Sequence, residues 1–123
     1  MITLDTGALI ALERKGARAL RLLAGVAEAS GRVTVPTVVL AEWWRGPPTK
    51  RMAKLFEGVE LEPLGPRLAR LAGDAVAAVR GATTIDAIVV ASAAQRGDAV
   101  ITSDMDDLVR LTAFFPGVRI VHA

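Results

Sequence analysis

The sequence predicts an α/β fold: a three-layer α/β/α sandwich around a mainly parallel central sheet. Short runs rich in β-branched residues alternate with segments of helical periodicity along the whole chain. Helices between consecutive strands are the crossovers that parallel pairing requires, and they cover both faces of the sheet. With 123 residues the chain is long enough to bury a hydrophobic core, so we expect residues 1–123 to form a single domain.

The first half of the chain contains two expected strands and four expected helices. Apolar residues recur at helical spacing along residues 17–29, and Pro36 stands between the second strand and the next helix. Gly46, Pro47 and Pro48 interrupt the chain between two helices. The expected elements are a strand over Ile2–Leu4, helices over Thr6–Arg14 and Ala17–Ala29, a strand over Val33–Val35, and helices over Thr37–Arg45 and Thr49–Phe56.

The second half contains three expected strands and three expected helices. The clearest helix of the chain has Leu68, Leu71, Ala72 and Ala75 on one face, and Gly97 is a natural stop for the helix after it. The expected elements are a strand over Val59–Leu61, helices over Arg67–Arg80 and Thr84–Arg96, a strand over Ala99–Thr102, a helix over Asp104–Ala113, and a strand over Val118–Val121.

The composition excludes several kinds of chemistry. No cysteine is present, which removes disulfides, zinc–thiolate sites and thiol nucleophiles. The single histidine is the penultimate residue, His122, a poor position for the base of a Ser-His-Asp mechanism. The net charge of +2 and a pI near 9.7, with positive charge supplied mostly by arginine, weakly favour a nucleic-acid partner.

No uncharged stretch approaches the ~18 residues of a spanning helix, and no basic segment precedes the first apolar run. We therefore expect a cytoplasmic protein without membrane association.

Four acidic residues lie in apolar surroundings: Asp5, Glu42, Asp86 and Asp104. Because burying a lone charge is very unfavourable, acids in such surroundings pair within the fold or face a cleft. Asp5 and Asp104 directly follow expected strands. Ligands of parallel sheets bind beyond the carboxyl ends of the strands, and these two residues are expected there.

Helix capping is the alternative role for three of these acids. Asp5 suits an N-cap, and the segments 83–86 and 103–106 each fit a capping box that contains Asp86 or Asp104. Glu42 lies well inside its helix, where no cap is needed, and an ion pair with Arg45 is its alternative role.

A cluster of these four carboxylates requires a counter-charge. Each pair about 4 Å apart repels by on the order of 4 kcal/mol at an effective dielectric constant near 20. Such repulsion is comparable to much of the stability of a small domain. Mg²⁺ or Mn²⁺ relieves it, and both ions prefer oxygen ligands. The four acids therefore predict a Mg²⁺ or Mn²⁺ site.

The segments around these acids resemble, in order and spacing, the PIN-domain ribonucleases, especially the short toxins of VapBC-type toxin–antitoxin pairs. The resemblance covers essentially the whole chain. The matching motifs are Asp5-Thr6-Gly7-Ala8-Leu9-Ile10, which looks like the opening motif, the helical Glu42, Asp86 at the start of a later helix, and Thr102-Ser103-Asp104 after a strand. The sequence departs from the family at Gly7, where many relatives carry a polar Ser or Asn.

The resemblance implies a metal-dependent endoribonuclease that hydrolyses RNA phosphodiester bonds in line and acts as the toxin of a toxin–antitoxin pair. It implies that Asp5, Asp86 and Asp104 coordinate Mg²⁺ or Mn²⁺ directly or through water. Glu42 is then a further ligand or the group that orients the attacking water.

The resemblance also implies a homodimer and a cognate antitoxin that binds across the active-site groove. Asp106 and Asp107 both follow Asp104, and the sequence does not decide which of them, if either, reaches the metal.

A basic segment beside the Glu42 helix is a candidate RNA contact. It consists of Arg45, Lys50, Arg51 and Lys54. Such side chains bind RNA phosphates, and an ordinary solvated helix face is the alternative.

The adjacent Trp43 and Trp44 point about 100° apart on a helix, so we expect one in the core and the other available to a partner chain.

The competing function is a catalytically inert RNA- or partner-binding module on the same scaffold, which needs the basic and aromatic residues but not the four acids. A receiver-like phosphoacceptor domain is disfavoured because no lysine follows Lys54. A haloacid-dehalogenase-type phosphatase is disfavoured because Asp5-Thr6-Gly7 lacks the second acid of an Asp-x-Asp motif. Neither a Gly-x-Gly-x-x-Gly motif nor a P-loop is present, so dinucleotide and NTP binding lack their phosphate sites.

Overall fold

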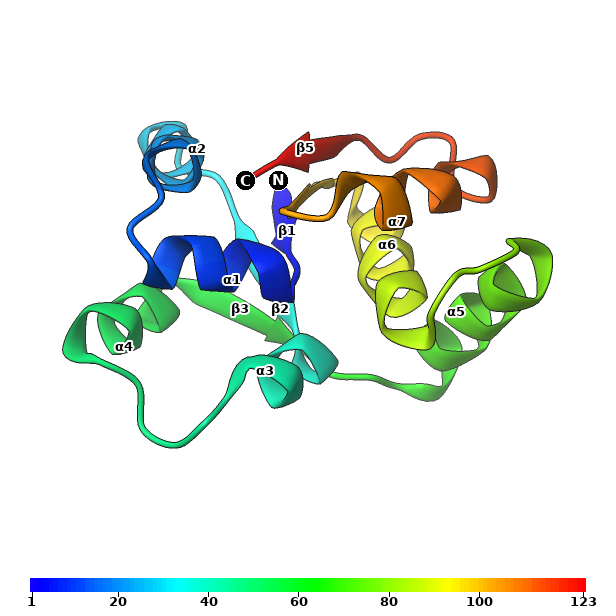
Figure 1. Ribbon diagram of the computed structural model, residues 1–123, viewed down its shortest axis with the longest axis horizontal. Coiled ribbons are helices and arrows are strands. Elements are labelled where there is room, and N and C mark those ends of the chain that lie inside the picture. The colour runs from blue at the N-terminus through cyan, green and yellow to red at the C-terminus, as the bar shows by residue number, and fades with distance from the viewer.

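The computed structural model describes residues 1–123, with a five-stranded sheet between two layers of helices (Figure 1). The elements are β1 (Ile2–Leu4), α1 (Thr6–Glu13), α2 (Ala17–Glu28), β2 (Val33–Pro36), α3 (Thr37–Trp43), α4 (Lys50–Glu57), β3 (Val59–Glu62), α5 (Pro66–Ala78), α6 (Thr84–Arg96), β4 (Ala99–Thr102), α7 (Met105–Val109), the 3₁₀ helix η1 (Arg110–Ala113) and β5 (Ile120–His122).

All strands of the sheet are parallel, in the order β3-β2-β1-β4-β5. The chain moves from β1 to β3 in one direction and then returns across the sheet to β4 and β5. Because crossovers between parallel strands are right-handed, the helices before and after this reversal cover opposite faces. In Figure 1, α1, α2 and α4 lie on one side of the strands and α5, α6 and α7 on the other. The predicted α/β/α fold class is confirmed.

The reversal of strand order occurs between β1 and β4, which pair directly with each other. Leu4 lies opposite Ile101, so the two strands end side by side at the same edge of the sheet. The segments that follow them leave towards opposite faces. This separation opens a crevice at the carboxyl edge, the usual ligand position in such sheets.

The hydrophobic core is one cluster of 28 buried residues, and α6 runs through it. Residues 87–93 of this helix are all buried. A helix that is apolar all round is covered on every side, and α6 is packed between the sheet and α5. Its polar exception, Ser92, donates a hydrogen bond of 3.1 Å to Glu62. No helix of the protein is long and apolar enough to cross a membrane.

The last turn of α6 is anchored by Arg96. Its Nε donates to Asp98 at 3.0 Å and its Nη2 to Thr3 at 2.8 Å and to Ser92 at 2.9 Å. Its Nη1 lies 2.9 Å from Glu62 in an ion pair that lacks hydrogen-bond geometry. Burial by itself raises the pKa of Asp98, but hydrogen bonds from the N-terminal ammonium, Arg96 and Thr3 outweigh it and hold this pKa below its usual value.

Two expected elements differ from the structure: one helix is divided in two, and one strand begins two residues later. The helix expected over 104–113 divides into α7 and η1. Leu108 and Leu111 are both buried, and the tighter 3₁₀ turn aligns residues three apart on the core side. The last strand begins at Ile120 rather than Val118, because Val118 closes a turn with its amide bonded to the carbonyl oxygen of Phe115 at 3.2 Å. The predicted difference in burial between the tryptophans is confirmed: Trp43 is buried and Trp44 is 43% exposed.

Candidate metal centre

The four acids singled out by the sequence line one cavity of about 250 Å³. Asp5 follows β1, Asp104 follows β4, Asp86 lies in the first turn of α6, and Glu42 lies in α3. The first two are adjacent because β1 and β4 end side by side. The remaining wall consists of Thr6, Gly7, Val39, Ile85, Val89 and Ser103. The structure therefore brings together residues that are up to 99 positions apart in the chain (5 to 104).

Helix capping accounts for only part of these acids. The Asp5 carboxylate accepts from the Ala8 amide at 2.8 Å, so Asp5 does cap α1, through one of its two oxygens. In α6 the cap is Thr83, whose hydroxyl accepts from the amide of Asp86 at 3.3 Å. Asp104 occupies the N-cap position of α7, but its side chain makes no capping bond. The capping box expected from Ser103 is therefore not formed.

Burial dominates the electrostatics of Asp5, which is only 8% exposed. Desolvation raises the pKa of this carboxyl above its usual value. Hydrogen bonds from Thr102 and the Ala8 amide act in the opposite direction, and the charges of Asp86 and Asp104 raise the pKa further. The charged form of Asp5 is thus disfavoured first by burial and then by the charges of Asp86 and Asp104.

Asp86 shows the same pattern from the other side of the cavity. Burial is the largest cause that raises its pKa, and a hydrogen bond from Thr83 opposes it. The charges of Asp107, Asp104 and Glu42 add to the increase. Four acids from separate segments therefore repel one another across one small space.

The structure distinguishes Asp107 from Asp106. A hydrogen bond between the carboxyl groups of Asp107 and Asp104 raises the pKa of Asp107 above its usual value. The charge of Asp107 also acts on Asp86. Asp107 does not line the acid cavity itself, and Arg110 lies 3.4 Å from it, whereas Asp106 is exposed. Of the two, Asp107 is the one whose charge acts on the acids of the cavity.

Glu42 is held by α1 and not by its own helix. The Thr6 hydroxyl donates a hydrogen bond to its carboxylate. The ion pair with Arg45 that served as the alternative role for Glu42 is absent, because the Arg45 Nη1 donates instead to the carbonyl oxygen of Trp44 at 2.7 Å. Thr6 is therefore a site residue that the sequence reasoning did not single out. Its position next to Asp5 was the available signal.

Gly7 fits closely against the other edge of the cavity. A Cβ atom on this residue would lie 2.1 Å from Oγ of Ser103 and 3.2 Å from the Ser103 amide nitrogen. Ser103 itself lines the cavity. Ser103, from the β4–α7 loop, thus places a hydroxyl group where a side chain at position 7 would lie.

The donor set of the cavity suits a hard divalent cation. No lysine or arginine lines it, and none of the four lining acids takes part in an ion pair of the structure. As the side chains stand, no three carboxylates are close enough to hold one ion together. Mg²⁺ usually keeps several waters and is bound through one or two carboxylates. The residues therefore fit a cation with one or two direct ligands and others that act through water.

The four residues of the basic segment do not share one environment. Lys50 and Lys54 are exposed on α4. Arg51 is half-buried, and its Nη2 donates to the carbonyl oxygens of Leu12 and Glu13 at 2.7 and 2.9 Å. Both carbonyl groups lie in the last turn of α1, where carbonyl oxygens lack intrahelical partners, and the Leu12 oxygen also accepts from the Lys15 amide at 3.1 Å. Arg51 thus connects α4 to α1. Arg45 lines a second cavity, which lies beside the cavity of the four acids.

Comparison with known proteins agrees with this geometry. The family model described as PIN domain matches residues 2–113. Among curated proteins no significant match is found.

Solved structures with the same fold include VapBC2, a toxin–antitoxin complex and FitAcB. VapBC2 from Rickettsia felis bound to a promoter DNA fragment has a TM-score of 0.76 and 14% identity, covering 100% of this chain and 99% of that chain. A toxin–antitoxin complex from Klebsiella pneumoniae has a TM-score of 0.72 and 19% identity, covering 96% and 95%. FitAcB from Neisseria gonorrhoeae has a TM-score of 0.66 and 19% identity, covering 98% and 96%. At these identities the likeness concerns the fold.

Asp86→Asn is expected to stabilise the metal-free protein at pH 7. The raised pKa means that the charged form of Asp86 lowers stability above that pKa, and that this loss disappears as the pH falls towards the unfolded value near 4. Melting in EDTA should show a Tm higher by roughly 2–5 °C at pH 7, with the difference shrinking towards pH 4. Asp74→Asn, at an exposed position of α5, is the control. A lower Tm for Asp86→Asn at pH 7 contradicts the repulsion.

Arg51→Ala and Lys50→Ala/Lys54→Ala should affect different properties. Hydrogen bonds from a charged donor contribute about 1.5–3 kcal/mol, so Arg51→Ala should lower the free energy of unfolding by about that amount in urea. The double lysine variant should stay within about 0.5 kcal/mol of the wild type. If the lysines contact RNA, their loss should flatten the log–log salt dependence of RNA binding by roughly 0.7 per phosphate contact. An unchanged slope assigns them to the solvated surface.

Proposed function

Because the chain belongs to the PIN domain family, we propose that it is a metal-dependent endoribonuclease that hydrolyses RNA phosphodiester bonds. One observation carries the proposal: four carboxylates from four separate segments line a single cavity that no cationic side chain lines. Their mutual repulsion lowers stability, so an arrangement of this kind indicates a binding role. The cofactor is then Mg²⁺ or Mn²⁺, because both prefer oxygen ligands.

In this proposal Asp5, Asp86 and Asp104 hold the cation directly or through water, and Asp107 supports Asp104. Glu42 is a further ligand or orients the attacking water. A bound divalent cation supplies charge neutralisation at the phosphate and makes water more acidic. The protein contributes orientation: hydrogen bonds from the Ala8 amide and the Thr102 hydroxyl hold the Asp5 carboxylate in place.

Two hydroxyl groups complete this orientation. Thr6 donates to Glu42 and so directs its carboxylate into the cavity. Thr102 accepts from the amide of Asp104 at 2.9 Å, which fixes the turn that carries this acid. Prepositioned groups of this kind lower the reorganisation needed in the transition state.

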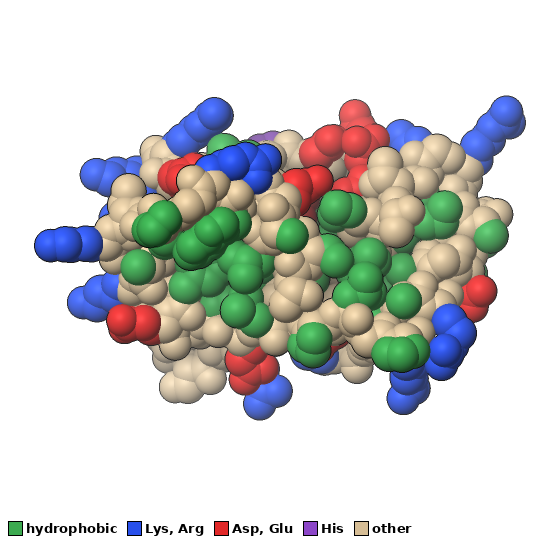
Figure 2. Space-filling model, turned by 90° about the horizontal axis from the view of Figure 1, so that it is seen from below, with side chains coloured by type: hydrophobic (Ala, Val, Ile, Leu, Met, Phe, Trp, Pro, Cys, Tyr) green, Lys and Arg blue, Asp and Glu red, His purple; other side chains and the backbone are tan.

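We further propose that the protein is the toxin of a toxin–antitoxin pair, acts in the cytoplasm as a single nuclease domain, and forms a homodimer that binds its cognate antitoxin. The named assemblies with this fold support the choice of partner. Surface composition supports it as well, because a band of hydrophobic side chains crosses the face shown in Figure 2. Hydrophobic surface patches mark protein contacts. Over the protein as a whole, the large hydrophobic side chains that are exposed are Met1, Leu20, Trp44, Leu61, Leu64, Val109 and Phe114.

Asp5→Asn and Asp86→Asn should each abolish Mg²⁺- or Mn²⁺-dependent RNA cleavage while the fold survives. Loss of groups that merely orient metal ligands reduces activity by about 10–100-fold, so loss of a ligand should reduce kcat/KM by at least about 100-fold. The measurement is cleavage of a sensitive single-stranded RNA with metal and with EDTA, using Asp74→Asn purified in parallel as control. Full activity in Asp86→Asn, or in EDTA, would mean that a contaminating nuclease cleaves the RNA and that the protein is the inert binding module.

Millimolar Mg²⁺ or Mn²⁺ should raise the Tm of the wild type. A ligand at 100 times its dissociation constant adds about 2.7 kcal/mol of stability, and relief of carboxylate repulsion is the source here. Asp104→Asn should reduce the shift, whereas the exposed neighbour variant Asp106→Asn should retain it. Absence of any shift in the wild type speaks against a cation site, and equal shifts in both variants speak against Asp104 as a ligand.

A further inference from the structure

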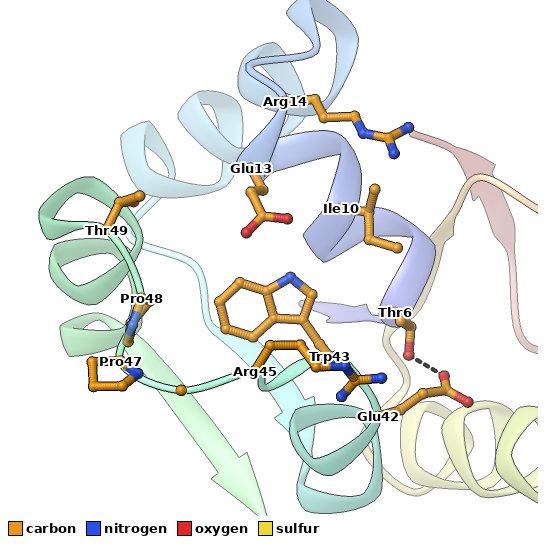
Figure 3. Close-up of a pocket in the computed structure, with 11 residues that line it drawn as sticks. Thr6, Ile10, Glu13, Arg14, Glu42, Trp43, Arg45, Pro47, Pro48 and Thr49 are labelled. Carbon is orange, nitrogen blue, oxygen red and sulfur yellow. Dashed lines mark hydrogen bonds between the residues drawn. The ribbon is translucent and has the colours of Figure 1, made fainter.

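A second cavity lies beside the acid cavity, between α1 and the segment that joins α3 to α4 (Figure 3). Its volume is about 410 Å³, within the range of sites for small ligands. Thr6 and Glu42 line both cavities, so the two adjoin at these side chains. A ligand in the second cavity therefore lies directly next to the proposed metal centre.

The second cavity presents a hydrogen-bond donor and an acceptor on neighbouring walls. Trp43 is only 9% exposed, and its indole nitrogen faces the cavity. The carboxylate of Glu13 points into the same space from α1 (Figure 3). The hydrogen bond drawn among the lining residues joins Thr6 and Glu42, and the indole N–H has no partner there. The indole nitrogen is not one of the buried atoms that lack a partner, so solvent reaches this donor from the cavity and a ligand there can accept its hydrogen bond.

Arg45 supplies a positive charge at the border between the two cavities. Its Nη1 donates to the carbonyl oxygen of Trp44 at 2.7 Å, which bends the side chain back. In Figure 3 the guanidinium group lies between Trp43 and Glu42. An arginine has five N–H donors, so most of them remain free to bind an anion such as a phosphate.

The walls of the second cavity are preorganised. Trp43 packs against Phe56 with 5.4 Å between ring centroids. Gly46 has a φ of +92°, which residues with a side chain rarely adopt, and Pro47 and Pro48 follow it. A preformed site loses less conformational entropy when it binds.

We propose that this cavity binds one nucleotide of unpaired RNA adjacent to the bond cleaved at the acid cavity. Arg45 contacts the phosphate between the two positions, and Glu13 together with the Trp43 N–H contacts the edge of the base. Guanine matches best, because its Watson–Crick edge places two N–H donors opposite the two carboxylate oxygens and an acceptor oxygen opposite the indole. Recognition of such edges requires unpaired bases. The inference rests on the proposed function, since the RNA must reach the metal centre.

The donors of the cavity favour a nucleotide over a basic peptide side chain. A lysine or arginine from a partner protein would satisfy Glu13 but would leave the Trp43 N–H without an acceptor. It would also be repelled by Arg45. A nucleotide supplies acceptors for both donors and an N–H for the carboxylate.

The test uses Trp43 as its own reporter. Trp44→Phe leaves it as the only tryptophan of the chain, and because Trp44 is 43% exposed the fold should persist, as a melting curve will check. In EDTA, guanosine 5′-monophosphate should change the Trp43 emission in a saturable way. Adding Glu13→Gln or Arg45→Ala should weaken this binding at least about tenfold, because each removes a charged hydrogen-bonding group. The matched controls Glu28→Gln and Arg70→Ala, at exposed positions of α2 and α5, should not change it.

The other arms of the titration test the ligand class. Adenosine, cytidine and uridine monophosphates should bind more weakly, and inorganic phosphate should not displace the nucleotide at equal concentration. Equal binding of all four nucleotides, or full displacement by phosphate, overturns base recognition. No response to any nucleotide overturns the proposal and leaves the cavity to a peptide.

Parallel cleavage assays separate this inference from the proposed function. If the wild type cleaves RNA with metal but Glu13→Gln and Arg45→Ala leave KM unchanged, the nucleotide site fails and the nuclease stands. If the emission responds as expected but no metal-dependent cleavage occurs, the nuclease fails and the nucleotide site stands. Support for both requires the emission response, together with a KM in these variants that rises more than kcat falls.

Discussion

The position of the whole site depends on how α6 is held in the core. Its residues 87–93 are buried on every side, so the helix cannot shift without exposing apolar surface. At its far end Arg96 bonds to Thr3 in β1 and to Asp98 before β4, and it pairs with Glu62 at the end of β3. One arginine thus fixes the helix against three segments of the sheet. The consequence appears at the opposite end, where the first turn of α6 carries Asp86 into the cavity between the ends of β1 and β4.

The acids of this cavity lack the positively charged partners that buried or half-buried acids have elsewhere in the protein. Other acids of the chain are paired: Asp98 with Arg96, and Glu62 with the same arginine. Burial raises the pKa values of Asp5 and Asp86, and the charges of neighbouring carboxylates raise them further. The repulsion persists because the acids sit on rigid elements whose packing is decided elsewhere, in the apolar core. The contacts that stabilise the fold lie in the core, away from the acids. The protein can therefore keep a site whose acids repel one another.

The sequence predicted the order of elements and the acid cluster because both depend on local or topological signals. Helical periodicity, Pro36 and Gly97 located the elements, and parallel topology placed Asp5 and Asp104 at one edge. Features that depend on side-chain packing were not predictable. Arg51 looked like part of a basic surface, but it reaches the carbonyl oxygens at the end of α1. The choice of Asp107 over Asp106 required the orientation of α7, and the helix expected over 104–113 changes to 3₁₀ geometry so that Leu111 can reach the core.

Glu42 links the acid cavity to the cavity beside it, and this has a consequence for how both bind their ligands. An acidic cavity by itself repels an RNA backbone, so either a cation or a nearby positive side chain must offset its charge. Glu42 faces the other acids on one side, while the cavity on its other side is also lined by Arg45. Because the Thr6 hydroxyl holds the carboxylate between them, the same negative charge contributes to the field in both spaces. Arg45 is not paired with Glu42, because its Nη1 donates to the carbonyl oxygen of Trp44, so its remaining donors are open to a phosphate whether or not a cation is bound. A cation beside Glu42 offsets the negative charge on one side of this residue, and Arg45 offsets it on the other.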